Sequence, residues 1–526
     1  MAKKQFKAES KRLLDLMINS IYTHQEIFLR EIISNASDAI DKLAYQALTD
    51  EKVGLNRSDF AIQLKVDEPS RTLTVSDNGI GMDHDEMENN LGTICKSGSL
   101  QFKKDMEKQD DIDIIGQFGV GFYSDFMVAD TVTVISKKYG SDEAWKWTSS
   151  GADGYTMEPA ERESAGTDVI MTLKADTEDE QYSRFLKTWE LQKLVKKYSD
   201  YIRYPIKLEM EKSRMKEETK DSDKPEYETY TENETLNSMV PLWQRAKKDI
   251  TPEEYNNFYK EKFFDFEDPI ATIHVSVEGA VTYKALLYIP ARAPYDFYTK
   301  DFKKGLQLYS SGVMIMENCE ELLPDCFRFV RGVVDSQDLS LNISREMLQH
   351  DRQLKFIAGN LEKKIKAELA KLMEQDREKY EKFYAAFGMQ IKYGVLNDYG
   401  AKKELLQDLL LYWSHKQNKL VSFKEYVDAM PEEQKYIYFA SGENRQRLSQ
   451  LPQLEKLGEK GFDVLLMTDE VDSFVPQTLG KYAEKDFRSV TQEDLGLSTD
   501  EEKKEAAEQA EKSKATLEFV KTTLGD

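Results

Sequence analysis

The sequence contains few cysteines and histidines, and neither type forms a pattern that binds metal. Its three cysteines are Cys95, Cys319 and Cys326, and a sparse, odd-numbered set of this kind predicts reduced thiols rather than a disulfide framework. The five histidines are also scattered, without the paired spacing of zinc ligands. We therefore expect neither a structural zinc site nor a catalytic histidine relay.

Long apolar runs are missing as well. The opening stretch, MAKKQFKAESKRLLDLM, is basic but has no apolar core of the length found in signal peptides. No run elsewhere reaches the roughly 18 apolar residues of a membrane-spanning helix. With reduced thiols, these absences lead us to expect a cytoplasmic protein.

Positive charge is in deficit. Lysine and arginine total 73 against 96 aspartates and glutamates, so the formal net charge is -23. A chain of this charge repels nucleic acids and anionic membrane surfaces, and we expect neither as a partner. What the sequence does have, over 526 residues, is enough hydrophobic material (40%) for roughly three or four domains.

A helix is predicted over residues 28–42, and it carries an unusual polar stripe. Glu31, Asn35 and Asp38 follow one another at helical spacing on one face, while apolar residues cover most of the remaining circumference. Such a helix packs on several sides, and burying carboxylates or amides without partners is costly. The stripe therefore faces a polar ligand or, in the plainer interpretation, solvent.

Two glycine-rich segments follow this helix. Residues 77–82 (DNGIGM) end a predicted hairpin with strands at 59–66 and 71–76, and their glycines permit close approach of a ligand, although a simple turn has a similar composition. Residues 116–122 (GQFGVGF) precede a helix-like stretch and offer unpaired N–H groups to an anion. A hinge, or a mobile lid over the polar stretch before them, would have the same composition.

The second half of the chain reads as further α/β structure. The highly charged residues 212–234 predict a short linker. Strands predicted at 435–440 and 462–468, with a helix between them, form a parallel β-α-β unit. A long helical region begins near Ser344, which leaves Arg345 in its first turn. A cation in the first turn is unfavourable against the helix dipole, so an anionic ligand could be the partner of Arg345. The alternative is an arginine that is solvated or paired locally.

The stripe and the two glycine-rich segments, in this order and spacing, resemble the nucleotide-binding boxes shared by gyrase-type topoisomerases, ninety-kilodalton heat-shock chaperones, histidine kinases and MutL. The match is closest to the bacterial heat-shock chaperones, and it extends to the stretches NNLGTICKSGS, GLQLYSSGVMI and DLSLNISREMLQ. The resemblance implies an α+β protein. A two-layer α/β sandwich ATPase domain of the Bergerat (GHKL) fold is followed by a multi-part α/β middle domain.

The expected domain organisation combines this resemblance with the composition of the chain. The family ends in a further domain that holds a dimer, and this chain stops at the first helix of that domain, so we expect a monomer or weak dimer with low ATPase activity. The expected parts are an ATP-binding domain (1–211), a charged linker (212–234), the large α/β part of the middle domain (235–375), its helical and small α/β parts (376–498), and the start of the C-terminal domain (499–526).

The resemblance also implies roles for individual residues. Glu31 would orient and activate the attacking water, Asn35 would hold Mg²⁺, and Asp77 would accept a hydrogen bond from the exocyclic amine of adenine. Arg345, from the second domain, would reach the γ-phosphate of ATP. The other residues expected to line the nucleotide pocket or cradle the phosphates are Asp38, Gly81, Met82, Asn90, Lys96, Gly119, Val120, Gly121, Phe122, Thr167 and Gln349.

The function implied is that of an ATP-dependent molecular chaperone. ATP would join two domains, hydrolysis would release them, and unfolded or partly folded client proteins would respond, with other chaperones as further candidate partners. Candidate aromatic residues for the client surface are Trp243, Tyr295, Phe297 and Tyr298, although core packing also explains them. The alternatives are a DNA-remodelling ATPase of the gyrase or MutL type, which the acidic balance disfavours, and a histidine kinase, for which no phosphoacceptor helix precedes the nucleotide domain.

Overall fold

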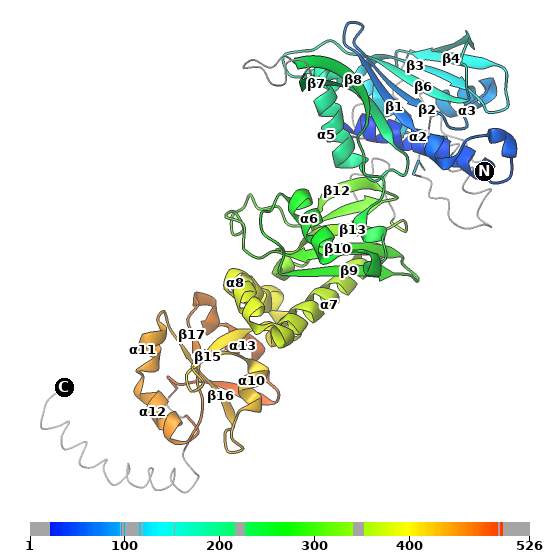
Figure 1. Cartoon of the computed structure of the whole chain (residues 1–526). Helices are drawn as coiled ribbons and strands as arrows, with labels where there is room; N and C mark the ends of the chain where they lie inside the picture. The colour runs from blue at the N-terminus through cyan, green and yellow to red at the C-terminus, as the bar shows by residue number, and fades with distance from the viewer. Residues whose placement is uncertain are drawn as a thin grey trace, which may run out of the picture. The chain divides into compact units, whose positions relative to one another are not determined.

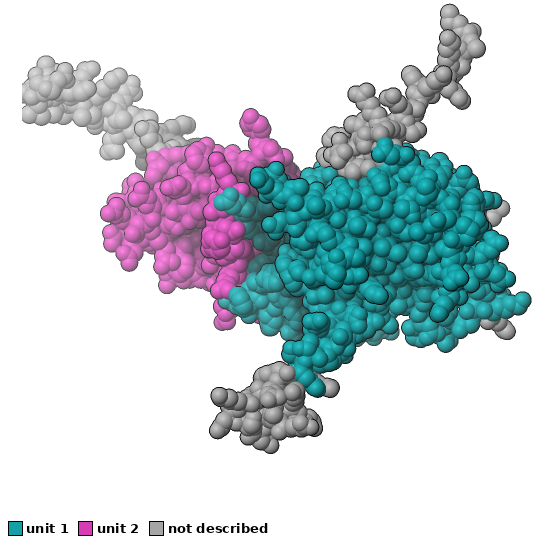
Figure 2. Space-filling view, turned by 90° about the horizontal axis from the view of Figure 1, so that it is seen from above, with its two compact units in different colours: residues 1–290, 301–323, 330–361 teal, residues 291–300, 324–329, 362–526 magenta. Residues whose placement is uncertain are grey.

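The protein mixes sheets and helices in two compact units, which confirms the expected α+β class (Figures 1 and 2). Unit 1 comprises Met1–Pro290, Asp301–Leu323 and Val330–Leu361, and unit 2 comprises Ala291–Lys300, Pro324–Phe329 and Glu362–Asp526. The computed structural model describes residues 22–94, 96, 99, 115–116, 119–151, 153–215, 227–339, 352–492 and 495–497.

An eight-stranded sheet forms the N-terminal part of unit 1, with the strand order β5-β4-β3-β6-β2-β1-β7-β8. Its pairs are antiparallel except for β1 with β7, which is parallel. Leu73, Val75 and other alternate residues of the strands enter one core, as half-buried antiparallel sheets require. The strands are β1 (Ile62–Asp67), β2 (Thr72–Asp77), β3 (Ala129–Lys137), β4 (Ala144–Ser149), β5 (Tyr155–Ala160), β6 (Gly166–Leu173), β7 (Ile206–Met215) and β8 (Tyr227–Thr235).

Helices α2 (Ile27–Gln46) and α5 (Thr188–Tyr198) contact each other and the same sheet, so they form a second layer over it (Figure 1). The apolar side chains of α2 are almost entirely buried, as the prediction of a helix packed on several sides requires. Burial extends to its polar residues, including Arg30 and Ser34. The shorter helix α3 (His84–Leu91) follows β2 and begins with a capping box between Asp83 and Glu86.

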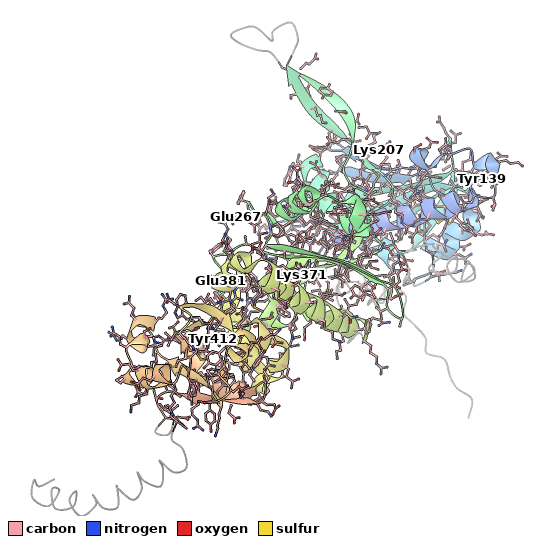
Figure 3. All side chains as sticks on the ribbon, turned by 60° about the horizontal axis from the view of Figure 1, so that its bottom comes forward. Tyr139, Lys207, Glu267, Lys371, Glu381 and Tyr412 are labelled. Atoms are coloured by element: carbon pink, nitrogen blue, oxygen red, sulfur yellow. The ribbon has the colours of Figure 1, made fainter. Side chains whose placement is uncertain are left out.

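Both ends of the segment expected to be a charged linker are β-strands. Residues 212–215 and 227–234 continue β7 and β8, which pair as a hairpin from Lys207 opposite Thr235 outward. Figure 3 shows this hairpin projecting from unit 1, with Lys207 labelled. The charges suit this position because charged side chains on an edge strand discourage pairing with another chain. Residues 216–226 lie outside the described residues.

A five-stranded sheet, with the order β12-β11-β13-β10-β9, completes unit 1. Aromatic residues join it to the first sheet: Trp243 is fully buried, lies edge-on to Tyr201 with ring centroids 4.6 Å apart, and donates from Nε1 to Asp335 at 2.9 Å. Trp243 is thus a core residue. The elements are α6 (Pro252–Phe263), β9 (Ala271–Val277), β10 (Tyr283–Ile289), β11 (Leu306–Ser310), β12 (Val313–Cys319) and β13 (Arg331–Asp335), followed by α7 (Arg352–Gln375), which runs on into unit 2.

Unit 2 is built from helices and a six-stranded sheet with the order β15-β14-β17-β16-β19-β18. Strands β16 (Tyr436–Ser441) and β17 (Leu465–Met467) pair in parallel and are separated in sequence by α11 (Arg445–Ser449) and α12 (Pro452–Glu459), which confirms the expected β-α-β unit. The remaining elements are α8 (Arg377–Gly400), α9 (Lys403–Leu406), β14 (Leu411–Ser414), β15 (Lys419–Ser422), α10 (Phe423–Asp428), α13 (Val475–Leu479), β18 (Lys481–Tyr482) and β19 (Lys485–Ser489).

A buried ion cluster holds α8 to the segment after β17. The Lys392 ammonium group lies 2.7 Å from Asp469 and 2.8 Å from Asp472, over the ring of Tyr412, which is labelled in Figure 3. We expect Lys392→Met to lower the free energy of unfolding by about 3–5 kcal/mol, because it leaves the carboxylate of Asp472 buried without its cation. Urea unfolding of the full chain measures this loss.

The matched control for Lys392→Met is Lys481→Met. Lys481 pairs with Glu484 at the same distance, 2.7 Å, but both side chains are exposed. An exposed pair contributes at most about 1 kcal/mol, so this variant should unfold almost as the parent does. Equal losses in the two variants would show that the burial of the Lys392 cluster has no energetic consequence.

Candidate functional site

The carboxylate of Glu31 is enclosed between a cation and the start of a 3-10 helix. Glu31 is 4% exposed, and its Oε1 accepts hydrogen bonds from Nε and Nη2 of Arg30 at 3.0 and 2.7 Å. On its other side begins η3 (Gly121–Met127): a Cβ at Gly121 would lie 2.6 Å from Glu31 Oε2. Only glycine permits this approach, so the second glycine-rich segment lies directly against the first residue of the α2 stripe.

The other half of the stripe binds backbone. Asp38, 1% exposed, accepts hydrogen bonds from the N–H groups of Ile115 and Gly116 at 2.8 and 2.7 Å. A Cβ at Gly116 would lie 2.9 Å from Asp38 Oδ2 and 3.3 Å from Asn35 Oδ1. Asp38 therefore does not face bulk solvent, because it receives the backbone N–H groups of Ile115 and of Gly116, the first residue of the second glycine-rich segment.

Asp77 stands at the end of β2, buried to 7% exposure. Its Oδ1 accepts a hydrogen bond from Gly79 N at 2.8 Å. Removal from water outweighs that bond and raises the pKa of Asp77 to about 7. Thr167 lies directly opposite Asp77 on β6, and the Thr167 hydroxyl is 2.8 Å from that of Ser136. The β2 end thus presents a carboxyl group beside a hydroxyl pair.

Gly79 and Gly81 serve the packing of backbone on backbone. A Cβ at Gly79 would lie 2.4 Å from the carbonyl carbon of Ala39 in α2, where Ile80 N donates to Ala39 O at 3.0 Å. Gly81 has a φ of +65°, and a Cβ there would lie 1.9 Å from the Lys137 carbonyl oxygen. Both positions require glycine because the backbone packs closely there, which places Asp77 against α2 and β3. The sequence analysis explained these glycines by the close approach of a ligand.

The remaining predicted residues of this region come, in sequence, between the end of β2 and the first turn of η3. Met82 N donates to Ser136 Oγ at 2.8 Å, and the Asn90 amide contacts the Met82 sulfur at 3.9 Å. Lys96 is exposed and donates to Asn89 Oδ1 at 2.7 Å; a Cβ at Gly119 would lie 2.5 Å from the Lys96 backbone. Val120 is buried, and Phe122 packs edge-on against Trp147 with ring centroids 5.4 Å apart. The last two predicted residues, Arg345 and Gln349, lie outside the described residues.

Several residues that matter here carry no role in the sequence analysis. Arg30, 1% exposed, binds Glu31, and its position next to Glu31 was the available signal. Burial lowers the pKa of Lys42, while the charges of Asp38, Glu86 and Asp77 oppose that effect. Arg162 donates to the Asp77 carbonyl oxygen at 2.9 Å from a distant part of the sequence, and no local pattern reveals such a contact.

A carboxyl acceptor at a strand end, a polar stripe along a buried helix, and a glycine-rich backbone segment at the far end of that stripe define the nucleotide-binding domain of an ATPase. The comparisons agree. Residues 22–197 match the family described as "Histidine kinase-, DNA gyrase B-, and HSP90-like ATPase", and residues 215–526 match the family "Hsp90 protein".

Curated relatives extend this match over the whole chain. "Chaperone protein HtpG" of Bacillus subtilis (strain 168) is 56% identical over 526 residues, covering 100% of this chain and 83% of the relative. The protein of the same name from Clostridium acetobutylicum is 57% identical over 524 residues, again with 83% of the relative covered. The chain therefore belongs to the Hsp90 family.

As a member of this family, the protein is an ATP-dependent chaperone that hydrolyses ATP and acts on client proteins. This confirms the function expected from the sequence and sets aside the DNA-remodelling alternative. Among the helices of the described residues, none combines the length and apolar content that crossing a bilayer requires.

Proposed function

We propose that unit 1 binds MgATP along α2, with adenine at Asp77 and the phosphates toward Glu31 and the backbone of residues 119–122. The observation that carries this proposal is the enclosure of the stripe: the buried carboxylates of Glu31 and Asp38 lie against Gly121 and Gly116 respectively. N–H groups of a glycine-rich segment bind phosphate, and a buried carboxylate beside them supplies a base. Thr167 and Gly81 support the adenine end.

The residues present fit a magnesium ion. Asn35 Oδ1 lies within 3.3 Å of where a Cβ at Gly116 would stand, so this amide oxygen borders a position that only glycine can occupy. A neutral oxygen suits an ion that keeps most of its own waters. Asn35 would hold Mg²⁺, which when bound neutralises charge on the phosphates.

Hydrolysis then depends on Glu31. The oxygen of a water molecule forms a bond to the γ-phosphorus, the bond to the bridging oxygen of ADP breaks, and the water proton passes to the Glu31 carboxylate. Arg30 favours the ionised form of Glu31 by donating two hydrogen bonds to it. The other oxygen, Oε2, lies toward Gly121, on the side where the proposal places the phosphates and the attacking water.

Arg345 is proposed to contact the γ-phosphate, with Gln349 one turn further on. We expect Arg345→Ala to slow ATP turnover of the full chain by about 10²-fold or more, because a donor to the transition-state charge is lost. ATP affinity of a fragment that ends before this residue cannot depend on it. The control is Arg352→Ala, which removes an exposed arginine in the same part of the chain; unchanged turnover in Arg345→Ala would remove this residue from the mechanism.

We also propose a cytoplasmic location, unfolded or partly folded proteins as clients, other chaperones as further partners, and a monomeric or weakly dimeric state of this chain. Of the four candidate aromatic residues, Trp243 and Phe297 are fully buried, whereas Tyr295 and Tyr298 are exposed. The exposed pair therefore remains the candidate for client contact. Sedimentation over a range of concentrations tests the oligomeric state.

A further inference from the structure

Arg162 lies in the loop between β5 and β6, and each nitrogen atom of its guanidinium group donates to an oxygen atom. Nε and Nη2 donate to the two carboxylate oxygens of Asp168, both at 3.2 Å. Nη2 also donates to the carbonyl oxygen of Asp77 at 2.9 Å, and Nη1 donates to that of Ser164. The Arg162 side chain is only 13% exposed. A planar guanidinium group held in this way is fixed in both position and orientation.

These contacts join the end of β2 to β6, at the place where adenine is proposed to bind. Asp77 is the last residue of β2 and lies opposite Thr167 on β6. In the preceding residue pair, Asp168 lies opposite Ser76. Arg162 thus links the backbone of Asp77 itself to a side chain of the adjacent strand, beside the residue that supports the adenine end.

Gly166 provides the space for this link. It is the first residue of β6 and has a φ of +127°. A Cβ there would lie 2.2 Å from the Asp77 carbonyl oxygen and 2.9 Å from Nη1 of Arg162. Another residue at this position would displace either the arginine or the end of β2. Glycine therefore leaves the carbonyl oxygen of Asp77 accessible, and the guanidinium group reaches it.

Charged groups act on Asp77 from two sides. Burial of its carboxyl group raises the pKa to about 7, the positive charge of Arg162 opposes that rise, and the negative charge of Asp168 adds to it. From α2, Lys42 interacts electrostatically with the same carboxylate. Lys137 on β3 directs its ammonium group to a backbone carbonyl oxygen, at 3.5 Å. The two cross-strand neighbours of Asp77 are uncharged; they are Ile62 on β1 and Thr167 on β6.

We propose that Arg162 is a positioning residue for ATP binding, which acts through Asp77 by fixing the end of β2 and by placing a positive charge near the carboxylate that accepts from adenine. The inference rests on the adenine-binding role proposed for Asp77. A backbone carbonyl held from one side gives the carboxylate of the same residue a fixed base, and precise binding requires such support. The positive charge favours the ionised carboxylate, which is the acceptor.

The test is calorimetric titration of MgATP into the full chain, from about pH 6 to about pH 9, for the parent, Arg162→Gln and Asp168→Asn. Arg162→Gln removes the positive charge. It should move the midpoint of the pH dependence of affinity upward by about half a unit or more and weaken binding at neutral pH by about threefold or more. Asp168→Asn keeps an acceptor oxygen for Arg162 but removes a negative charge, so its midpoint should move downward. The same nucleotide titrates every variant, so its own protonation cancels in the comparison.

Arg71→Gln is the matched control. Arg71 immediately precedes the other end of β2, and its Nη2 also donates to one backbone carbonyl oxygen and one aspartate, those of Lys174 and Asp176. This variant removes contacts of the same kind at the end of β2 remote from Asp77. Both its affinity for ATP and its midpoint should therefore stay at the parent values.

Opposite shifts in the two variants do not arise from a general loss of packing, which lowers affinity by the same factor at every pH. Unchanged midpoints in both would overturn the proposal, and so would a loss of affinity in Arg162→Gln that is independent of pH. Urea unfolding shows whether Arg162→Gln folds; if it does not, the direction of the shift in Asp168→Asn decides.

Asp77→Asn, titrated alongside, separates the two levels of the argument. Parent-like ATP binding by Asp77→Asn would refute the adenine-binding role of Asp77. Lost binding there, together with unchanged midpoints in Arg162→Gln and Asp168→Asn, would refute only the role of Arg162.

Discussion

Replacing Glu31 with alanine should reduce ATP hydrolysis by about 10²- to 10⁴-fold, the usual contribution of a general base, while ATP affinity changes little. The side chain lies against Gly121, at the proposed phosphate end of α2, and its Oε1 is already committed to Arg30. It therefore contributes little to ground-state binding and much to proton removal. Single-turnover hydrolysis and calorimetric titration of ATP, on the same preparation, measure the two quantities.

Two controls make this result interpretable. Glu31→Gln keeps the shape and leaves an acceptor for Arg30, so it should lose hydrolysis with a smaller loss of stability than Glu31→Ala, which removes an acceptor of the buried Arg30 guanidinium group. Glu190→Ala removes another buried glutamate of unit 1, on α5 and outside the site, and should leave hydrolysis intact. Affinity that falls in step with the rate would instead indicate that Glu31 binds the nucleotide.

The sequence predicted those parts of the site that depend on periodicity. Helical spacing placed Glu31, Asn35 and Asp38 on one side of α2, and the surrounding apolar residues predicted the burial of that helix. The pattern could not show that Asp38 binds the N–H groups of Ile115 and Gly116, because those residues are remote in sequence. Local spacing predicts which side chains share a face of a helix, but it does not predict which residues from elsewhere in the chain contact them.

Composition was a weaker guide than periodicity. Residues 212–234 have the charge of a linker, yet their ends lie in β7 and β8, where cross-strand pairs such as Lys212 with Glu232, at 3.0 Å, accommodate the charge. Asp125 shows the reverse: it sits in a helix-like stretch, and only the packing of η3 on α2 reveals that it is buried with no donor from the described part of the chain. Tertiary contacts decide both cases.

At the other end of the site, Asp77→Asn should weaken ATP binding by about 10²-fold, because a charge-assisted hydrogen bond is lost and an amide can present a donor where adenine also presents one. Binding by the parent should also depend on pH. The ionised carboxylate is the acceptor, and the pKa of Asp77 is about 7. Apparent affinity should therefore rise with pH through neutrality and fall about tenfold per unit well below it, in proportion to the ionised fraction.

The pH dependence of folding stability distinguishes a loss of ATP binding from a loss of folded protein. The unfolded chain ionises Asp77 near its ordinary value of 3.8, whereas the folded chain holds the proton until about pH 7. Stability contributed by this group is therefore complete at low pH and declines as pH rises through that interval. Asparagine does not ionise, so Asp77→Asn should be at least as stable as the parent at neutral pH while losing ATP. Asp67→Asn, at the exposed end of the neighbouring β1, should change neither property. Tight ATP binding by a stable Asp77→Asn protein would show that adenine is recognised elsewhere.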